Sequence, residues 1–456
     1  MTMFQGPDVP SRELVDTCVH CGFCLPACPT YLLDNEEMDS PRGRIYLMKA
    51  GLDGRADMTP SYVRHFDSCL GCLACVTACP SGVQYGPLIE RTRAQIEQHY
   101  SRPVVDRWFR ALLLAIVPYP SRLRIALAPL AVLGPLLRAF GGSTKEDPPY
   151  EAAGNAAGRD DVGRVSFSRP RLWRRVRAAV SLAPRVTWRS LFDRLPEHTP
   201  PVGAERKRVA VLTGCVQRLS FAHVNHATVR VLAAEGCRVT VPARQGCCGA
   251  LSLHCGHIDH ARTLARRSIE VFEAVDAERI VVNAAGCGSA MKEYGELLAD
   301  DPVWAARAQA IAKKVRDVSE LVVELGERQA PRHPIAARVV YHDACHLAHG
   351  QGIRTEPRVL LHDIPGVEVV TPEEWEICCG SAGIYNLVQP DTAARLGERK
   401  AQHIARMSPD MIATANPGCI LQIAASGRRL GYDWPILHPI ELIDASIRGI
   451  DPRKSD

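Results

Sequence analysis

The sequence predicts an α+β protein of several domains, in which a helical N-terminal module precedes two tandem α/β repeats with parallel sheets. Its 456 residues exceed what one hydrophobic core usually contains, so about three domains are expected. Two regularly spaced groups of cysteines lie within the first 100 residues. From residue 207 onward, strand-like runs, cysteines and helix-like segments recur in the same order, which indicates a tandem repeat.

The N-terminal cysteines follow one spacing twice, C-x2-C-x2-C-x3-C and then proline. In two-cluster ferredoxins the first three cysteines of such a run bind one cubane cluster, and the fourth binds the other cluster. The pattern therefore predicts two [4Fe–4S] clusters. We expect one on Cys18, Cys21, Cys24 and Cys79, and the other on Cys69, Cys72, Cys75 and Cys28.

Zinc sites and disulfides explain these cysteines less well. Zinc usually takes two C-x2-C pairs and needs neither the third evenly spaced cysteine nor the proline. Disulfides require an oxidising compartment, whereas the start MTMFQGPDVPSREL has no secretory character. We therefore expect reduced thiols that act as metal ligands, in a cytoplasmic protein.

Residues 1–100 are expected to form a helical ferredoxin-type domain, longer than a compact bacterial ferredoxin. About forty residues separate the two quartets, and they include helix-like stretches at 43–54 and 61–69. Residues 86–100 have helical periodicity, with Leu88, Ile89 and Ile96 on one side.

Residues 101–206 are expected to form a basic connector. Residues 101–210 contain 20 Lys and Arg against 9 Asp and Glu, and 141–161 have the composition of a disordered segment. No aromatic platform or nucleic-acid motif accompanies this charge, so nucleic acid is not expected to bind. A solvated linker, an anionic membrane surface and an acidic partner subunit remain open.

The apolar stretch 111–140 lies in this connector. Its longest run, Ile125 to Leu137, contains Pro129 and Pro135 and is shorter than the ~20 residues that span a bilayer. We expect a buried helical hairpin in preference to an interfacial or partner-docking segment.

The repeats are expected at 207–330 and 331–448. The first reads RVAVLTGC (208–215), VTVPARQGCCG (239–249) and IVVNAAGC (280–287), and the second reads RVVYHDAC (338–345), VEVVTPEEWEICCG (367–380) and MIATANPGC (411–419). Each strand-like run ends at a cysteine and precedes a helix-like segment, a pattern typical of a parallel sheet covered by helices. Functional residues of such sheets gather beyond the carboxyl ends of the strands.

The repeat cysteines should therefore form two crevices. The first would contain Cys215, Cys247, Cys248 and Cys287, and the second Cys345, Cys378, Cys379 and Cys419. Each set could bind a further iron–sulfur cluster, with Gly249 and Gly380 allowing backbone close to the inorganic sulfides. A redox dithiol and inert buried cysteines are the alternatives. Polar residues flank the second crevice as supporting groups or occasional ligands: His342, Asp343, His346, His349 and Asn386.

Several motifs are absent from the chain. It contains no G-x-G-x-x-G, G-x-x-x-x-G-K-[ST], G-x-S-x-G or H-E-x-x-H, so no dinucleotide, nucleotide triphosphate, serine hydrolase or zinc protease site is indicated. Oxidation of an alcohol or hydroxy acid removes two electrons, usually as hydride to a flavin or nicotinamide. We therefore expect a carrier that receives electrons from a flavin on another subunit and has no catalytic residue of its own.

These residues resemble a known family. CVHCGFCLPACPTY (18–31), PRGRIYLMK (41–49), CLGCLACVTACPSGVQYG (69–86) and the two Cys-Cys-Gly (CCG-type) repeats are similar to the iron–sulfur subunits of glycolate oxidase, also called glycolate dehydrogenase. TGCVQ, QGCCGAL, AAGCGSAMKEYG, CCGSAGIYN and HPIELID favour this member of a wider group. That group includes subunits of anaerobic glycerol-3-phosphate dehydrogenase and of heterodisulfide reductase, a thiol- and disulfide-handling enzyme, and these are the alternative.

The resemblance implies a hetero-oligomer with FAD-binding dehydrogenase subunits that oxidise glycolate to glyoxylate and often accept D-lactate. FAD is expected on the partner only, and electrons would pass to a membrane acceptor such as quinone, with the complex peripheral on the inner face of the cell membrane. In heterodisulfide reductase repeats the last anchor is C-x2-C. Here Gly288-Ser289-Ala290 or Ile420-Leu421-Gln422 follows the final cysteine, so a fifth thiol is missing from both copies.

Overall fold

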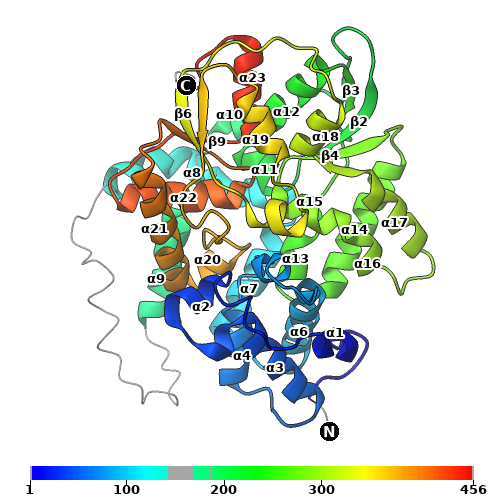
Figure 1. The fold of residues 1–456 in the computed structure, drawn as a ribbon, viewed down its shortest axis with the longest axis vertical. Helices are drawn as coiled ribbons and strands as arrows, with labels where there is room; N and C mark the ends of the chain where they lie inside the picture. Colours follow the sequence, from blue (N-terminus) through cyan, green and yellow to red (C-terminus); the bar gives the residue numbers. More distant parts are fainter. Residues whose placement is uncertain (1–2, 142–168, 185, 454–456) are drawn as a thin grey trace.

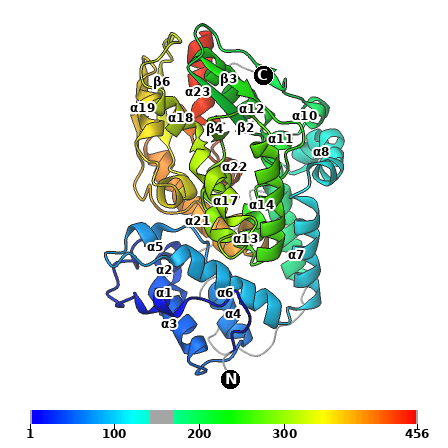
Figure 2. The same cartoon turned by 90° about the vertical axis from the view of Figure 1, so that its right-hand side faces the viewer.

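A computed structural model describes residues 3–141, 169–184 and 186–453 (Figure 1). The N-terminal helices lie at the bottom of the view, and the two repeats lie above them in both orientations (Figures 1 and 2). Residues 142–161, for which disorder was predicted, lie outside the described residues.

The N-terminal module is built from short helices with the cysteine loops between them. They are α1 (Arg12–Asp16), α2 (Pro29–Asp34), the 3-10 helix η1 (Glu37–Asp39), α3 (Pro41–Leu52), α4 (Pro60–Asp67), α5 (Ala74–Thr77) and α6 (Tyr85–His99). The helices predicted near 43–54, 61–69 and 86–100 are confirmed as α3, α4 and α6. In α3 and α4, Ser40 or Thr59 caps the first turn, and a proline stands at the first helical position, where an N–H would be unpaired.

Each repeat contains a sheet whose main strands are parallel, as predicted. The strand orders are β1-β3-β2-β4-β5 and β7-β6-β8-β9, and among the strand pairs of the described residues only β1–β3 is antiparallel. The strands are β1 (His198–Thr199), β2 (Lys207–Leu212), β3 (Cys237–Thr240), β4 (Arg279–Val282), β5 (Val315–Asp317), β6 (Ala337–Tyr341), β7 (Val367–Val370), β8 (Met411–Ala413) and β9 (Ile436–Leu437). Val209 pairs with Val239, and the equivalent Val339 pairs with Val369. The copies therefore share strand order as well as sequence anchors.

The duplication extends further than the three sequence anchors. β5 and β9 each add a fourth parallel strand, and a helix follows each: α18 (Val318–Glu324) and α23 (Pro439–Arg448). Both helices begin with a capping box, Asp317 with Glu320 and His438 with Glu441. Strands of two or three residues are too short to show periodicity in the sequence. The two capping boxes are therefore the sequence signal for this fourth strand and helix of each repeat.

Helices cover both sheets. They are α11 (Val216–Ser220), α12 (Ala222–Ala234), α13 (Ala250–His254), α14 (Ile258–Glu273), α15 (Ala285–Lys292), α16 (Tyr294–Leu297) and α17 (Ala305–Lys314) in the first repeat. The second repeat has the π-helix η3 (His346–Gly350), α19 (Glu356–His362), α20 (Tyr385–Val388), α21 (Pro390–Arg406) and α22 (Pro417–Arg429).

The two repeats share one hydrophobic core. Helix α12 of the first repeat packs on α23 of the second, and α18 packs on α19, which is the same pairing with the copies exchanged. One core cluster includes Val211 of β2, Tyr341 of β6 and Ile440 of α23. Ion pairs reinforce this contact: Arg230 binds Asp444 with two bonds of 2.8 and 2.6 Å. The repeats therefore form one body.

The N-terminal module contacts the first repeat through α6, which lies against α13 and α14. Arg93 of α6 donates to the carbonyl of His254 at 2.9 Å. Gly256 has φ +83°, and a Cβ there would lie 2.5 Å from the Arg93 carbonyl oxygen. Only glycine fits this approach, so the contact is built into the backbone.

This contact also brings carboxyl groups together, which makes stability depend on pH. Burial, followed by the charges of Glu90 and Glu296, raises the pKa of Glu293 to about 8, against an ordinary value of 4.5. Between about pH 4.5 and pH 8, Glu293 keeps a proton in the folded protein that it has lost in the unfolded chain. Glu293 alone should therefore make the unfolding free energy fall as pH rises toward 8, by at most about 1.4 kcal/mol per pH unit, and its contribution should then level off.

Glu293→Gln should remove the part of this dependence that Glu293 contributes, while Glu90, whose pKa burial also raises to about 8, keeps its own. Thermal unfolding midpoints measured from about pH 5 to pH 8 should decline in the wild type relative to the variant. The exposed Glu270→Gln on α14 is the matched control and should follow the wild type. Parallel curves for Glu293→Gln and the wild type would contradict the assignment.

The described part of the connector contains four helices: α7 (Val104–Ile116), α8 (Pro120–Gly141), α9 (Arg169–Ser181) and α10 (Trp188–Phe192). The hairpin predicted within 111–140 exists as α7 and α8, but the expectation that it is buried was wrong. Trp108 is 69% exposed, Leu112 56% and Ile125 75%, whereas Leu114 and Leu123 are buried. Among the described residues no single helix has the length and apolarity to cross a membrane. Val104–Ile116 with Pro120–Ala131 meets that test only as a pair bent by 105°.

Candidate metal centres

The first N-terminal hollow gathers the first three cysteines of one quartet with the last cysteine of the other. It has a volume of about 410 Å³, counting the part open to solvent. Its lining includes Cys18, Cys21, Cys24, Cys75 and Cys79. Cys21 is exposed, so this hollow reaches the surface. The fold thus brings Cys79 of the second quartet to the first three cysteines of the first quartet, as predicted. That these cysteines bind a cluster stays a prediction.

The second hollow lies deeper. It has a volume of about 300 Å³ on the same measure, and its cysteines are Cys28, Cys69, Cys72 and Cys75, all buried. Cys75 lines both hollows, so they are immediate neighbours. Two adjacent hollows with four or more thiols each fit a pair of cubane clusters.

The two cysteine loops share an unusual backbone. Left-handed residues stand on both sides of the second cysteine in each: His20 (φ 55°) and Gly22 (φ 90°) in the first, and Gly71 (φ 65°) and Leu73 (φ 63°) in the second. This conformation is costly for His20 and Leu73, by about 1–2 kcal/mol each. Such strain concentrates at functional sites, where surrounding structure over-determines the backbone.

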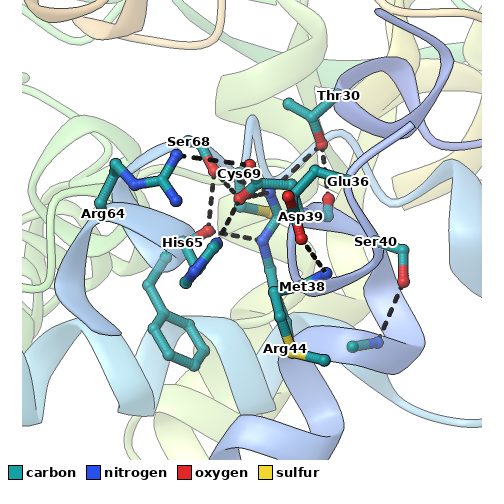
Figure 3. A network of polar contacts seen from close by, with 12 residues as sticks. Thr30, Glu36, Met38, Asp39, Ser40, Arg44, Arg64, His65, Ser68 and Cys69 are labelled. Carbon is teal, nitrogen blue, oxygen red and sulfur yellow. Dashed lines mark hydrogen bonds and ion pairs between the residues drawn. The ribbon is translucent and has the colours of Figure 1, made fainter. Parts of the chain in front are cut away.

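A buried polar network supports the second hollow (Figure 3). Arg44, 1% exposed, donates to the carbonyl of His65 at 2.6 Å, to Ser68 Oγ at 2.9 Å and to Thr30 Oγ1 at 3.2 Å. The Asp39 carboxylate accepts from Ser68 Oγ at 2.7 Å and lies 3.5 Å from the Arg44 guanidinium. The network joins η1, α3 and α4 behind the cysteines.

The network also places positive charge beside one thiol. Burial opposes ionisation of Cys69, but the charges of Arg44 and Arg93 outweigh it, so its pKa is lowered. The N–H of Gly71 points at this sulfur at 3.4 Å. Cys69 is thereby biased toward thiolate, the form that binds metal. In contrast, burial and then the nearby Cys345 thiol raise the pKa of Cys72.

The first-repeat quartet converges at the carboxyl ends of β2, β3 and β4. Cys215, Cys247 and Cys248 are buried in one core cluster, and Cys287 packs against it. The contact of Cys215 with Cys247, followed by burial, raises the pKa of the Cys215 thiol. The close approach to inorganic sulfide expected at Gly249 stays a prediction, and helix packing gives a further reason for glycine there. Gly249 has φ +90°, and its Cβ would meet the Ala261 carbonyl of α14 at 3.1 Å, so helix packing requires it.

The second-repeat quartet is arranged in the same way. The Sγ atoms of Cys345 and Cys378 are 4.0 Å apart, and this contact, followed by burial, raises the pKa of Cys345. Cys379 and Cys419 are 1% and 2% exposed. In both repeats the structure therefore brings the expected four thiols together, and whether they hold metal stays a prediction.

The polar residues predicted beside the second crevice separate into two groups. His342 lies within 4.8 Å of Cys379 and Cys419, counted between possible ligand atoms, and His346 Nδ1 lies 3.5 Å from Cys345 Sγ. The other three bind elsewhere: Asp343 pairs with Arg358 at 2.6 Å, His349 with the Glu376 carbonyl at 3.1 Å, and Asn386 with Gln422 at 3.2 Å.

Lys400 is a site residue that the sequence analysis missed. It lies on α21, is 2% exposed, and donates to the Glu374 carbonyl. Burial lowers its pKa to about 8, although the nearby Cys379 and Cys378 oppose that shift. It stands 22 residues after Cys378, so only the packing of α21 reveals it.

The second-repeat quartet borders the second N-terminal hollow. One hydrophobic cluster contains Cys72 and Cys378, with Cys345 packed against it. Tyr385 of α20 donates to the Ser68 carbonyl at 3.0 Å, and Thr77 Oγ1 lies 3.0 Å from His349 Nδ1. Three groups of cysteines thus follow one another through the protein interior.

Comparisons with known proteins agree with this arrangement. Residues 14–83 match a 4Fe-4S dicluster domain, and residues 209–292 and 339–424 each match a cysteine-rich domain. The chain is 36% identical over 424 residues to the probable glycolate oxidase iron-sulfur subunit of Bacillus subtilis (strain 168), covering 92% of this chain and 90% of that one. It is 34% identical over 444 residues to the glycolate oxidase iron-sulfur subunit of Escherichia coli (strain K12), covering 95% of both. Lactate utilization protein A of Exiguobacterium sp. (strain ATCC BAA-1283 / AT1b) is 30% identical over 240 residues, 53% of this chain and 98% of that one.

Proposed function

Because the chain belongs to the family of glycolate oxidase iron–sulfur subunits, we propose that it relays electrons from an FAD-binding partner to a quinone at the inner face of the cell membrane. It is an iron–sulfur subunit of an oxidoreductase that acts on hydroxy acids. The substrates would be glycolate and D-lactate, oxidised on the partner subunit. Bound clusters supply one-electron carriers, which a flavin can feed one electron at a time.

The row of cysteine groups is the observation that carries this proposal. The first hollow shares Cys75 with the second, and Cys72 of the second touches the second-repeat quartet. The chain surrounds this row with buried apolar side chains and leaves one end, at Cys21, open to solvent. Adjacent sites allow electrons to pass from one to the next, and the exposed end at Cys21 offers them an entry.

The exposed end offers a place for the flavin-bearing partner to dock. Val19 is 68% exposed and Phe23 66%, and both flank Cys21 on the loop around the first hollow. Exposed large apolar side chains beside a redox site are typical of a protein contact. We assign the entry of electrons to this loop.

The connector offers a surface for the membrane. Its helices expose apolar side chains at helical spacing: Val104, Val105, Trp108 and Leu112 on α7, Trp173, Val176 and Val180 on α9, and Trp188 and Phe192 on α10. Tryptophan favours the membrane–water interface, and the basic charge of residues 101–210 favours an anionic surface. Interfacial binding thus accounts for both the charge and the exposure.

The thiol–disulfide alternative has less support from the site. Exchange needs an accessible thiolate. The repeat cysteines are mostly buried, and the pKa values of Cys215 and Cys345 are raised.

The proposal is tested by reconstituting the full chain with its FAD-binding partner and adding glycolate. Reduction of a water-soluble quinone analogue should depend on this chain, as should reduction of quinone in anionic vesicles. The double variant Trp108→Ser, Trp173→Ser should reduce the water-soluble analogue at the wild-type rate. Its rate with quinone in anionic vesicles should fall, on the order of tenfold. Val303→Ser, which removes an equally exposed side chain from the first repeat, should change neither. Quinone reduction by the partner alone would contradict the relay, and equal vesicle rates in the double variant would contradict the membrane surface.

A further inference from the structure

The second repeat contains an imidazole that no hydrogen bond explains. Both ring nitrogens of His342 are without a partner among the described residues, and the side chain is 1% exposed. Buried polar atoms are nearly always paired, so such an exception requires a cause. A ligand held by the imidazole is one such cause.

The surroundings of His342 show what that ligand would be. A ring nitrogen, Cys379 Sγ and Cys419 Sγ all lie within 4.8 Å of one another. They come from three places: His342 follows β6, Cys379 lies in the loop before α20, and Cys419 lies in the first turn of α22. Imidazole and thiolate together are ligands for iron and zinc. The remaining thiols of the quartet, Cys345 and Cys378, lie 4.0 Å apart on the side toward Cys72.

The first repeat differs at this point. Counting from the first cysteine of each copy, Leu212 occupies the position of His342. Counting from Leu264 and Leu396, which each lie against the loop glycine, Ser268 occupies the position of Lys400. The first repeat therefore has neither the imidazole nor the buried ammonium group, although its four cysteines are the same.

We infer that the second repeat binds an iron–sulfur centre with His342 as a ligand beside its four cysteines, and that the first repeat cannot form the same centre. The inference deepens the proposed function and rests on it, since the centre would be a further carrier next to the second N-terminal cluster. The neutral imidazole adds no charge to the four thiolates, whereas the Lys400 cation makes the surroundings of this centre less negative. Less negative surroundings favour the reduced form, which suits a late position in a relay.

The test uses the full chain purified without oxygen, with iron and acid-labile sulfide counted per chain. Wild-type protein should contain clearly more than the eight or so irons of two cubanes. Pulsed electron paramagnetic resonance on protein labelled with ¹⁵N-histidine should show a nitrogen coupled to the reduced centre. His342→Leu, which introduces the residue of the first repeat, should lose that coupling and the extra iron. His342→Cys should recover iron without the coupling, and His349→Gln should retain both.

Three outcomes would overturn the inference. They are a wild-type iron content near eight per chain, zinc in place of iron and sulfide, and nitrogen coupling that persists in His342→Leu. Misfolding is separated by circular dichroism and by the signals of the two N-terminal clusters, which all variants should keep. Absence of those two signals from the wild type would instead contradict the proposed function.

Discussion

Cys28→Ala should empty the hollow lined by Cys69, Cys72 and Cys75, not the one beside its own sequence neighbours. The chain should lose about four of the roughly eight N-terminal irons and one of two cluster signals. Cys79→Ala should remove the other cluster. The reason is geometric: each fourth cysteine lines the hollow of the opposite quartet. Iron, sulfide and electron paramagnetic resonance spectra measure the loss.

Double variants make the assignment decisive. Cys28→Ala combined with Cys69→Ala should cost no more iron than either alone, because both remove ligands of one cluster. Cys28→Ala combined with Cys18→Ala should cost both clusters. Cys237→Ala is the matched control, since Cys237 is fully buried in β3 and belongs to none of the four cysteine groups. Additive loss from Cys28 and Cys69 would refute the exchange.

Arg44→Met should be among the most destabilising single changes in the N-terminal module. It removes the bonds to His65, Ser68 and Thr30 and leaves the Asp39 carboxylate buried beside an apolar side chain. Breaking a buried charge pair from one side costs about 3–5 kcal/mol. Urea unfolding, followed by loss of cluster absorbance, measures the effect, and Arg44→Lys should recover part of it.

Arg64→Met is the matched control for that variant. Arg64 lies 4.0 Å from the same carboxylate, but its side chain is 60% exposed. Surface changes of this kind usually shift stability by less than about 0.5 kcal/mol. Similar losses from the two variants would show that charge near Asp39 matters and the buried bonds of Arg44 do not.

The sequence was most informative where ligands or caps lie close together along the chain. The C-x2-C spacing brings three cysteines to one loop, and Ser40 or Thr59 before proline marks a helix start, so the module was predictable. The sheets followed from strand-like runs that recur with their cysteines.

Features that depend on three-dimensional convergence were not predictable. His342 was one of five polar candidates, and only the meeting of β6, the Cys379 loop and α22 distinguishes it. Lys400 reaches its site through helix packing. Exposure of the α7–α8 hairpin was missed because the apolar composition of 111–140 is the same for a core helix and for an unpartnered one.

The shared core of the repeats sets the order in which the chain can fold during synthesis. Helix α12 packs against α23, and Arg230 of α12 pairs with Asp444, which lies 214 residues later in the chain. Until that segment leaves the ribosome, the part of α12 that packs on α23 has no partner, although α12 can already pack on β3 of its own sheet. The first repeat can thus pair its strands early, but it closes its core only after the second has been made.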